Sequence, residues 1–341
     1  MHARDGDLPI PLPAVLGHEG SGVVAAVGSS VRTVAPGDSV VLGWPSCGTC
    51  RNCRGGEPSY CAEFLTLCFS GARPDGTTAV RAGSGSGSGS SRAPLADHFF
   101  GQSSFAEYAT VQERTVVRVP SAAPLPLLGP LGCGVGTGAG AVFNALMPPP
   151  GSTLAVFGPG AVGLSAIMAA RVAGCARVIA VARNDRQLAQ ALDLGATDVV
   201  DTRADDAVVA ITALTGEGAD FTVECMGHPD VVRQAVDALR PLGTCALVGV
   251  SPPGTQVHLD HAAIILGRRV VGVNGYAGPG DLLINRLVEL HAQGRFPFDR
   301  LITTYPFERI NEAVADVQRR IAVKAVLLMP NSLSDQTGAS R

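Results

Sequence analysis

The middle of the chain carries the pattern that most restricts its fold. Residues 154–157 form a short apolar run typical of a buried strand, and residues 164–172 have the composition of a helix. The segment between them reads G-x-G-x-x-G, in which the glycines give a tight turn, close approach of a pyrophosphate and close helix–strand packing. A glycine-rich turn without a ligand is the alternative, but the strand–turn–helix setting favours a dinucleotide site. The residues predicted to contact the phosphates are Gly158, Gly160, Ala161, Val162 and Gly163.

Strand-like and helix-like segments continue to alternate after this motif. We expect strands at residues 177–181, 198–200, 220–225, 245–250 and 269–273, with helices at 206–215 and 229–239. Such alternation implies a parallel sheet covered by helices on both faces. We therefore assign residues 135–286 to a Rossmann domain with a doubly wound parallel sheet.

The flanking segments differ in composition from this domain. Residues 14–120 are rich in Val, Gly and Pro, with extended runs at 22–27 and 38–42 and two more strands expected within 104–119. Residues 301–329 have the pattern of two strands around a helix at 309–318, and we expect them to complete the first domain. The predicted fold class is thus α/β, with a β-rich domain over 1–134, the Rossmann domain over 135–286 and a C-terminal return over 287–341. The Gly–Ser run at 83–91 predicts a flexible coil without chemistry.

Four cysteines within 15 residues form a second specific pattern, C-x2-C-x2-C-x7-C. Zinc prefers a tetrahedral shell, and a thiolate cluster on one tight loop supplies all four ligands. Four protein ligands leave no position for substrate, so the predicted zinc is structural. Two disulfides or unligated thiols are the alternatives, which a chain of intracellular character disfavours. The predicted ligands are Cys47, Cys50, Cys53 and Cys61.

Length and composition exclude several function classes. A chain of 341 residues is long enough for two domains, and its net charge of −3 does not favour nucleic acid or an anionic membrane as partner. The most apolar stretch, residues 154–182, is interrupted by Pro159, Arg171 and Arg177 and is not expected to span a bilayer. Residues 1–13 are polar and broken by prolines, unlike a signal peptide. We therefore expect a cytoplasmic enzyme with small-molecule partners.

Motifs spread over nearly the whole chain carry a family resemblance. They are residues 17–22 (GHEGSG), the four-cysteine loop, 101–105 (GQSSF), 129–134 (GPLGCG), 158–163 (GPGAVG) and 294–312 (GRFPFDRLITTYPFERINE). These motifs resemble the zinc-dependent medium-chain alcohol dehydrogenases, and within them the benzyl- and aryl-alcohol dehydrogenases. The resemblance implies a GroES-like catalytic domain, a Rossmann domain, and a homo-dimer or homo-tetramer. It also implies interconversion of primary, aromatic or allylic, alcohols and aldehydes by hydride transfer to or from NAD(P).

The resemblance also assigns a second, catalytic zinc. His18 and Cys133 match two of its ligands, and Glu19 matches an acid that can approach the metal. Taken alone, His18 is as readily an ordinary loop histidine, and Cys133 is more readily a buried core residue. His2 matches the family's proton-relay histidine.

The family's first zinc ligand lies in a C-x-[ST]-D-x-H motif, whose last two positions match Met1 and His2. The ligand cysteine, the relay Ser or Thr and the acid of this motif are absent from the sequence given, so the catalytic zinc site is expected to be incomplete. We therefore expect the sequence to start at an internal methionine of a longer gene product. A catalytically impaired dinucleotide-binding protein, held by its structural zinc, is the alternative function. An upstream in-frame C-x-[ST]-D motif would decide between the two.

Coenzyme choice is predicted from the end of the second Rossmann strand. Family members that use NAD place an acid there to bind the adenosine ribose, whereas this chain has Ala182 followed by Arg183, with Arg186 close by. Losing the carboxylate removes repulsion toward a 2′-phosphate, and a guanidinium can hold that phosphate. We therefore predict NADP over NAD, with Asp185 as the ribose partner if NAD is used. Lys324 matches a family position that carries a cation toward the pyrophosphate.

Overall fold

The computed structural model describes residues 8–81 and 95–330 and divides into two compact units. The first unit takes in residues 1–133, 279–288 and 301–341, and the second takes in 134–278 and 289–300. Residues 279–300, which the sequence divided at 286, are thus shared between the units. His2 and the Gly–Ser run at 83–91 lie outside the described residues.

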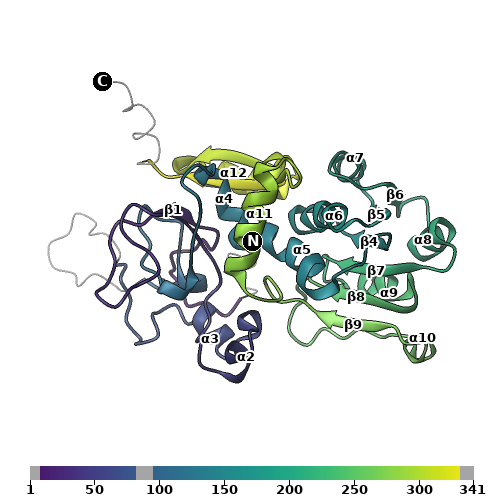
Figure 1. The fold of residues 1–341 in the computed structure, drawn as a ribbon, viewed down its shortest axis with the longest axis horizontal. Coiled ribbons are helices and arrows are strands. Elements are labelled where there is room, and N and C mark those ends of the chain that lie inside the picture. Colours follow the sequence, from purple (N-terminus) through teal and green to yellow (C-terminus); the bar gives the residue numbers. More distant parts are fainter. Residues whose placement is uncertain (1–7, 82–94, 331–341) are drawn as a thin grey trace. The chain divides into compact units, whose positions relative to one another are not determined.

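The second unit is built on one six-stranded parallel sheet (Figure 1). The strand order is β6-β5-β4-β7-β8-β9, which is the doubly wound order of dinucleotide-binding domains. The central strand β4 is buried on both sides, which accounts for its unbroken apolar run. The strands are β4 (Thr153–Phe157), β5 (Arg177–Ala182), β6 (Asp198–Asp201), β7 (Ala219–Glu224), β8 (Leu239–Leu247) and β9 (Arg269–Gly272).

Helices pack on both faces of this sheet (Figure 1). Side chains of Asn184, Asp206 and Asp260 cap three of them by accepting backbone N–H groups of the first turn. The helical segments of this unit are α5 (Gly134–Gly140), a π-helical turn (Ala141–Leu146), α6 (Ala161–Ala173), α7 (Asp185–Asp193), α8 (Ala207–Thr215), α9 (Pro229–Asp237) and α10 (His261–Ile265).

The first unit holds two small sheets among its described residues. Strands β1 (Ser21–Val23), β2 (Ser39–Leu42) and β3 (Val116–Arg118) are antiparallel, whereas β10 (Ile302–Pro306) and β11 (Lys324–Leu328) are parallel. Helix α12 (Ile310–Gln318) connects the parallel pair, as the sequence predicted for residues 301–329. The remaining helices are α2 (Arg51–Arg54), α3 (Phe64–Phe69), α4 (Leu125–Leu128) and α11 (Gly280–Ala292), the last shared between the units.

Short 3-10 turns join these elements. In the first unit they are Pro58–Tyr60, Phe99–Gly101, Glu113–Thr115, Gly129–Gly132 and Phe307–Arg309, and Phe298–Leu301 spans a change of unit. The chain crosses between the units near this last turn, at residue 300.

Several bounds of the predicted strands were wrong. Strand β1 ends at Val23, although an extended run was expected over residues 22–27, and β8 ends at Leu247 rather than at residue 250. Only one strand forms within residues 104–119, because Ser104 and Phe105 donate backbone bonds to Gly17 and Leu16 without extending them into a ladder. Strand β8 starts at Leu239, six residues earlier than predicted, because the chain already pairs with Ala219 there, ahead of an irregularity in the ladder. The α/β fold class itself is confirmed.

Within the described residues, no single helix is long and apolar enough to cross a membrane. One bent pair, 125–132 with 134–146, meets that criterion by length and composition alone.

Candidate active site and metal sites

The four-cysteine loop is organised by its own backbone. Cys50 caps helix α2, its sulfur accepting the N–H of Cys53. The sulfur of Cys47 accepts the N–H groups of Thr49 and Cys50 at 3.4 and 3.3 Å, and the sulfur of Cys61 accepts the N–H of Cys47 at 3.2 Å. These local bonds turn all four sulfurs toward one point.

The sulfur positions suit a tetrahedral metal. All four sulfurs lie within 4.8 Å of one another, and Cys47 Sγ and Cys53 Sγ are 3.9 Å apart. A tetrahedral zinc with Zn–S bonds of about 2.3 Å places its sulfurs about 3.8 Å apart. None of the chain's nine cysteines, all within the described residues, forms a disulfide.

The pKa values of the four cysteines shift in two directions, two of them down and two of them up. Hydrogen bonds from the backbone and side chain of Thr49 lower the pKa of Cys47 to about 6, and backbone hydrogen bonds also lower the pKa of Cys50. Burial raises the pKa of Cys53 to about 12 and also raises that of Cys61. Since Cys53 and Cys61 are protonated at neutral pH, metal binding to all four sulfurs releases protons.

A second cluster joins residues distant in the sequence. His18 and Glu19 precede β1, whereas Cys133 follows the 3-10 turn Gly129–Gly132. His18 Nε2 lies 3.1 Å from Cys133 Sγ, and one donor atom from each of His18, Glu19 and Cys133 lies within 4.8 Å of the others. The close approach depends on Gly129, where an added Cβ would lie 2.3 Å from the Glu19 carbonyl oxygen.

The donor chemistry of this cluster suits a catalytic zinc. One nitrogen, one carboxylate and one sulfur give three ligands, the number that leaves a fourth position open. Burial lowers the pKa of His18 to about 4, which keeps the imidazole neutral as a metal ligand must be. Burial, reinforced by Glu19, raises the pKa of Cys133 to about 12. The thiol therefore stays protonated at neutral pH until a bound metal displaces the proton.

Lys324 enters this cluster from strand β11. Its ammonium donates to Glu19 Oε1 at 2.5 Å, and the side chains of the pair are about one-fifth exposed. Sequence reasoning assigned Lys324 to the coenzyme pyrophosphate, which stays a prediction. The ion pair with Glu19 was not foreseen, because 305 residues separate the partners.

Aromatic rings around His18 were also missed. The His18 ring stacks on Phe100, with centroids 4.5 Å apart and planes at 25°, and meets Phe99 edge-on at 5.6 Å. Trp44 meets Phe100 edge-on, with ring centroids 5.3 Å apart. His98 and Phe100 take left-handed φ values of 63° and 51°, which non-glycine residues adopt at a cost and which place the rings.

The GQSSF motif (residues 101–105) joins the chain on either side of His18 through side-chain hydrogen bonds. Gln102 accepts the Gly20 N–H at 3.0 Å through its side-chain oxygen. Ser103 Oγ donates to the Val15 carbonyl at 2.6 Å and accepts the Phe99 N–H at 2.9 Å. The motif therefore fixes the segments on both sides of His18, which explains why a loop without catalytic groups marks the resemblance.

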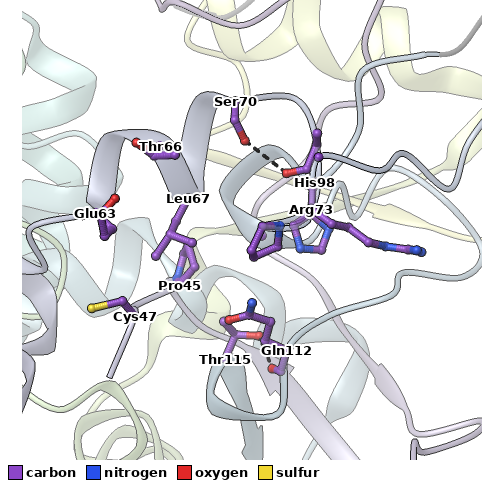
Figure 2. A pocket seen from close by; sticks show the side chains of 14 residues that line it. Pro45, Cys47, Glu63, Thr66, Leu67, Ser70, Arg73, His98, Gln112 and Thr115 are labelled. Carbon is purple, nitrogen blue, oxygen red and sulfur yellow. Dashed lines mark hydrogen bonds between the residues drawn. The ribbon is translucent and has the colours of Figure 1, made fainter. Parts of the chain in front are cut away.

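The first unit also contains a cavity of about 430 Å³ beside the four-cysteine loop (Figure 2). Cys47, Leu67, Arg73, His98 and Thr115 are among its lining residues, and the lining is mostly apolar. Neither His18 nor Cys133 lines it, so it is distinct from the His18 cluster.

The backbone of the predicted dinucleotide turn requires glycine at two of its positions. Gly158 has a φ of +84°, and an added Cβ on Gly163 would lie 2.4 Å from the Gly158 carbonyl oxygen. A Cβ on Gly160 would meet nothing within 4 Å, so the turn leaves open space at the N-terminus of α6, which is where the sequence predicts the pyrophosphate.

At the end of β5 the structure places the predicted ribose-contact residues beside a further charged group. Ala182 is the last residue of β5, Arg183 is exposed, and Asp185 and Arg186 begin α7. Asp185 forms an ion pair with Arg203, a residue that sequence reasoning did not single out.

A doubly wound sheet with a glycine-rich turn in one unit, together with a four-cysteine loop and a three-donor cluster in the other, is the combination expected of a zinc-binding dehydrogenase. Residues 1–121 match the alcohol dehydrogenase GroES-like domain, and residues 161–289 match the zinc-binding dehydrogenase domain. The chain belongs to the zinc-dependent medium-chain alcohol dehydrogenases, as the sequence motifs indicated.

Individual relatives agree with this family. A geraniol dehydrogenase of Castellaniella defragrans is 45% identical over 329 residues, covering 95% of this chain and 86% of the relative. An alcohol dehydrogenase zinc-binding domain protein from Burkholderia ambifaria superposes with a TM-score of 0.93 at 48% identity, covering 96% of this chain and 87% of the other. Benzyl alcohol dehydrogenase from Acinetobacter calcoaceticus superposes at 0.91 with 43% identity and the same coverage. The chain is therefore an alcohol oxidoreductase that acts on small alcohols and aldehydes with zinc and a nicotinamide dinucleotide.

Proposed function

We propose that this enzyme interconverts primary alcohols bearing an aromatic or allylic group with their aldehydes, transferring hydride to or from NADP in preference to NAD. The observation that carries the proposal is the cluster of His18, Glu19 and Cys133, with aromatic rings stacked against its imidazole. Two relatives are named for geraniol and benzyl alcohol, which share an unsaturated carbon next to the carbinol carbon.

His18 and Cys133 hold the catalytic zinc in this proposal, and Glu19 is a third donor. When bound, zinc supplies Lewis-acid chemistry that helps an alcohol to lose its proton before hydride transfer. The chain's own contribution is positional. Phe100 fixes the plane of the His18 ring, and Lys324 balances the charge of Glu19 and holds one of its oxygens.

The coenzyme is held in this proposal by the turn of Gly158, Gly160 and Gly163, with Ala161 and Val162 at the start of α6. The missing acid at Ala182 and the cations of Arg183 and Arg186 support a preference for the 2′-phosphate of NADP. Assembly into two or four copies stays a prediction, with β9 at one edge of the sheet as its expected contact.

Steady-state kinetics tests the substrate class. Benzyl alcohol and geraniol should give kcat/KM values well above those of hexan-1-ol and of 3,7-dimethyloctan-1-ol, the saturated counterpart of geraniol. The saturated counterpart separates unsaturation from size and branching. Equal values for geraniol and its saturated counterpart would contradict the proposed selectivity and leave the dehydrogenase class unchanged.

A further inference from the structure

The second unit carries a charged cluster at the ends of two adjacent strands. Strands β5 and β6 are parallel, and their register places Ala182 opposite Asp201. The Thr202 N–H continues this pairing by donating to the Ala182 carbonyl at 2.9 Å. Asp201 and the residues after it therefore lie directly beside the position where NAD-using relatives are expected to carry an acid.

Arg203 binds two carboxylates at this place. Its Nε lies 2.9 and 3.1 Å from the two oxygens of Asp201, and its Nη2 lies 2.5 Å from Asp201 Oδ2. The same Nη2 also donates to Asp185 Oδ1. The bonds from Arg203 lower the pKa of Asp201 to about 2, so this carboxylate stays ionised and paired over the physiological range.

Both acids that could replace the missing ribose partner are therefore engaged by one guanidinium. Asp185, the alternative ribose acceptor in the sequence, has one oxygen committed to Arg203 although its side chain is 79% exposed. Arg203 is thus the cation that both carboxylates contact at this end of the two strands. Without Arg203, Asp185 and Asp201 would both lose this ion pair.

We propose that Arg203 is a positioning residue for coenzyme selection. By holding Asp185 and Asp201, it prevents them from accepting the ribose hydroxyl of NAD and from repelling the 2′-phosphate of NADP. This inference rests on the proposed coenzyme site at the end of β5. Exposed ion pairs of this kind contribute little to folding stability, so a role in binding is separable from a structural one.

The test compares two arginines that form ion pairs at opposite ends of the β5–β6 strand pair. Arg203→Gln removes the pair at the carboxyl ends, whereas Arg177→Gln removes the Arg177–Asp198 pair, 3.1 Å apart, at their starts. Dissociation constants for NADPH and NADH are measured by fluorescence of the bound reduced nicotinamide, which needs no turnover. We expect Arg203→Gln to lower the preference for NADPH over NADH at least about tenfold, because a released carboxylate would repel the 2′-phosphate and could accept a charge-assisted hydrogen bond from the ribose hydroxyl of NADH. Arg177→Gln should change both constants alike.

A second variant tests whether the carboxylate carries the effect. In Arg203→Gln with Asp185→Asn, the released acid is neutral, and we expect the gain in NADH affinity to be reduced and part of the NADPH affinity to return. An unchanged preference in Arg203→Gln, or equal weakening of both coenzymes, overturns the role of Arg203. Tighter binding of NADH by the unmutated enzyme overturns the proposed NADP preference instead, and the shift on Arg203→Gln still decides the role of Arg203.

Discussion

The two metal sites of the first unit are built in opposite ways. The four-cysteine site draws its ligands from 15 consecutive residues and shapes them with bonds inside the same loop. The His18 site joins residues 115 apart in the chain, and the ion pair that supports it spans 305. The first site therefore depends on local turns, whereas the second exists only when the whole unit is folded.

The two sites also differ in the ligand atoms that they offer to a metal. The cysteine loop offers four sulfurs and no other donor type, which closes the shell around a metal. The His18 site mixes nitrogen, oxygen and sulfur, is lined by aromatic rings, and keeps its histidine neutral by burial. A closed thiolate shell suits a permanent structural metal, and an open mixed shell suits one that exchanges a ligand during catalysis.

The largest expected effect is on catalysis at the His18 site. Cys133→Ala or His18→Ala should abolish alcohol oxidation, because each removes a proposed zinc ligand, while coenzyme binding and one zinc per chain remain. Cys175→Ala, which truncates another buried cysteine, is the matched control and should retain activity. Undiminished turnover in either ligand variant would contradict the site assignment.

At the cysteine loop we expect a substitution to affect zinc content and stability. Cys53→Ser should lose the tightly held zinc and lower the melting temperature, since three remaining thiolates leave the tetrahedral shell open and the loop then loses the stabilisation that metal binding supplies. Limited proteolysis should then cut within residues 47–61. A variant that keeps its zinc and its protease resistance would show that the four sulfurs do not share a metal.

The unfolding free energy of the metal-free protein should depend on pH through His18. The pKa of His18 is about 4 in the folded metal-free protein and about 6.5 when unfolded, so the unfolded state binds more protons between these values. The unfolding free energy should therefore fall as the pH drops from about 6.5 to 4, by up to about 3 kcal/mol. Urea unfolding of the metal-free protein measures this, and His18→Asn should lack that part of the slope. An identical slope in the variant would contradict the burial of His18.

A smaller effect is expected from the supporting ion pair. Lys324→Met leaves the Glu19 carboxylate without its cation, which should cost about 1–3 kcal/mol of unfolding free energy because the pair is mostly buried. Glu19→Gln with Lys324→Met should recover part of that loss. Additive effects of the two single substitutions in this double-mutant cycle would show that the residues do not interact.

The comparison also explains what the sequence could reveal. The cysteine ligands and the glycine turn were predictable because their spacing and neighbouring segments encode the geometry locally. The doubly wound sheet followed from alternating strands and helices in the same way. His18 and Cys133 were proposed only through the motifs around them, since neither residue has a distinctive spacing of its own.

Contacts between distant segments could not be read from the sequence. The pairing of Lys324 with Glu19, the stacking of Phe100 on His18 and the capture of Asp185 by Arg203 all depend on how strands and turns meet in space. The wrongly predicted second strand within residues 104–119 is also explained by contacts between distant segments. Its backbone bonds go to Leu16 and Gly17, in a turn whose left-handed residues no alternation of side chains predicts.

Stepwise removal of zinc, followed together with activity, tests the difference between the sites most directly. The enzyme is dialysed against increasing chelator, and zinc content and alcohol oxidation are measured on the same samples, with circular dichroism as the check on folding. The predicted result is that activity disappears with the more weakly held zinc, while one zinc per chain and the folded state persist. Activity that survives until the last zinc leaves, or a fold that collapses with the first, would contradict the assignment of a structural cysteine site and a catalytic His18 site.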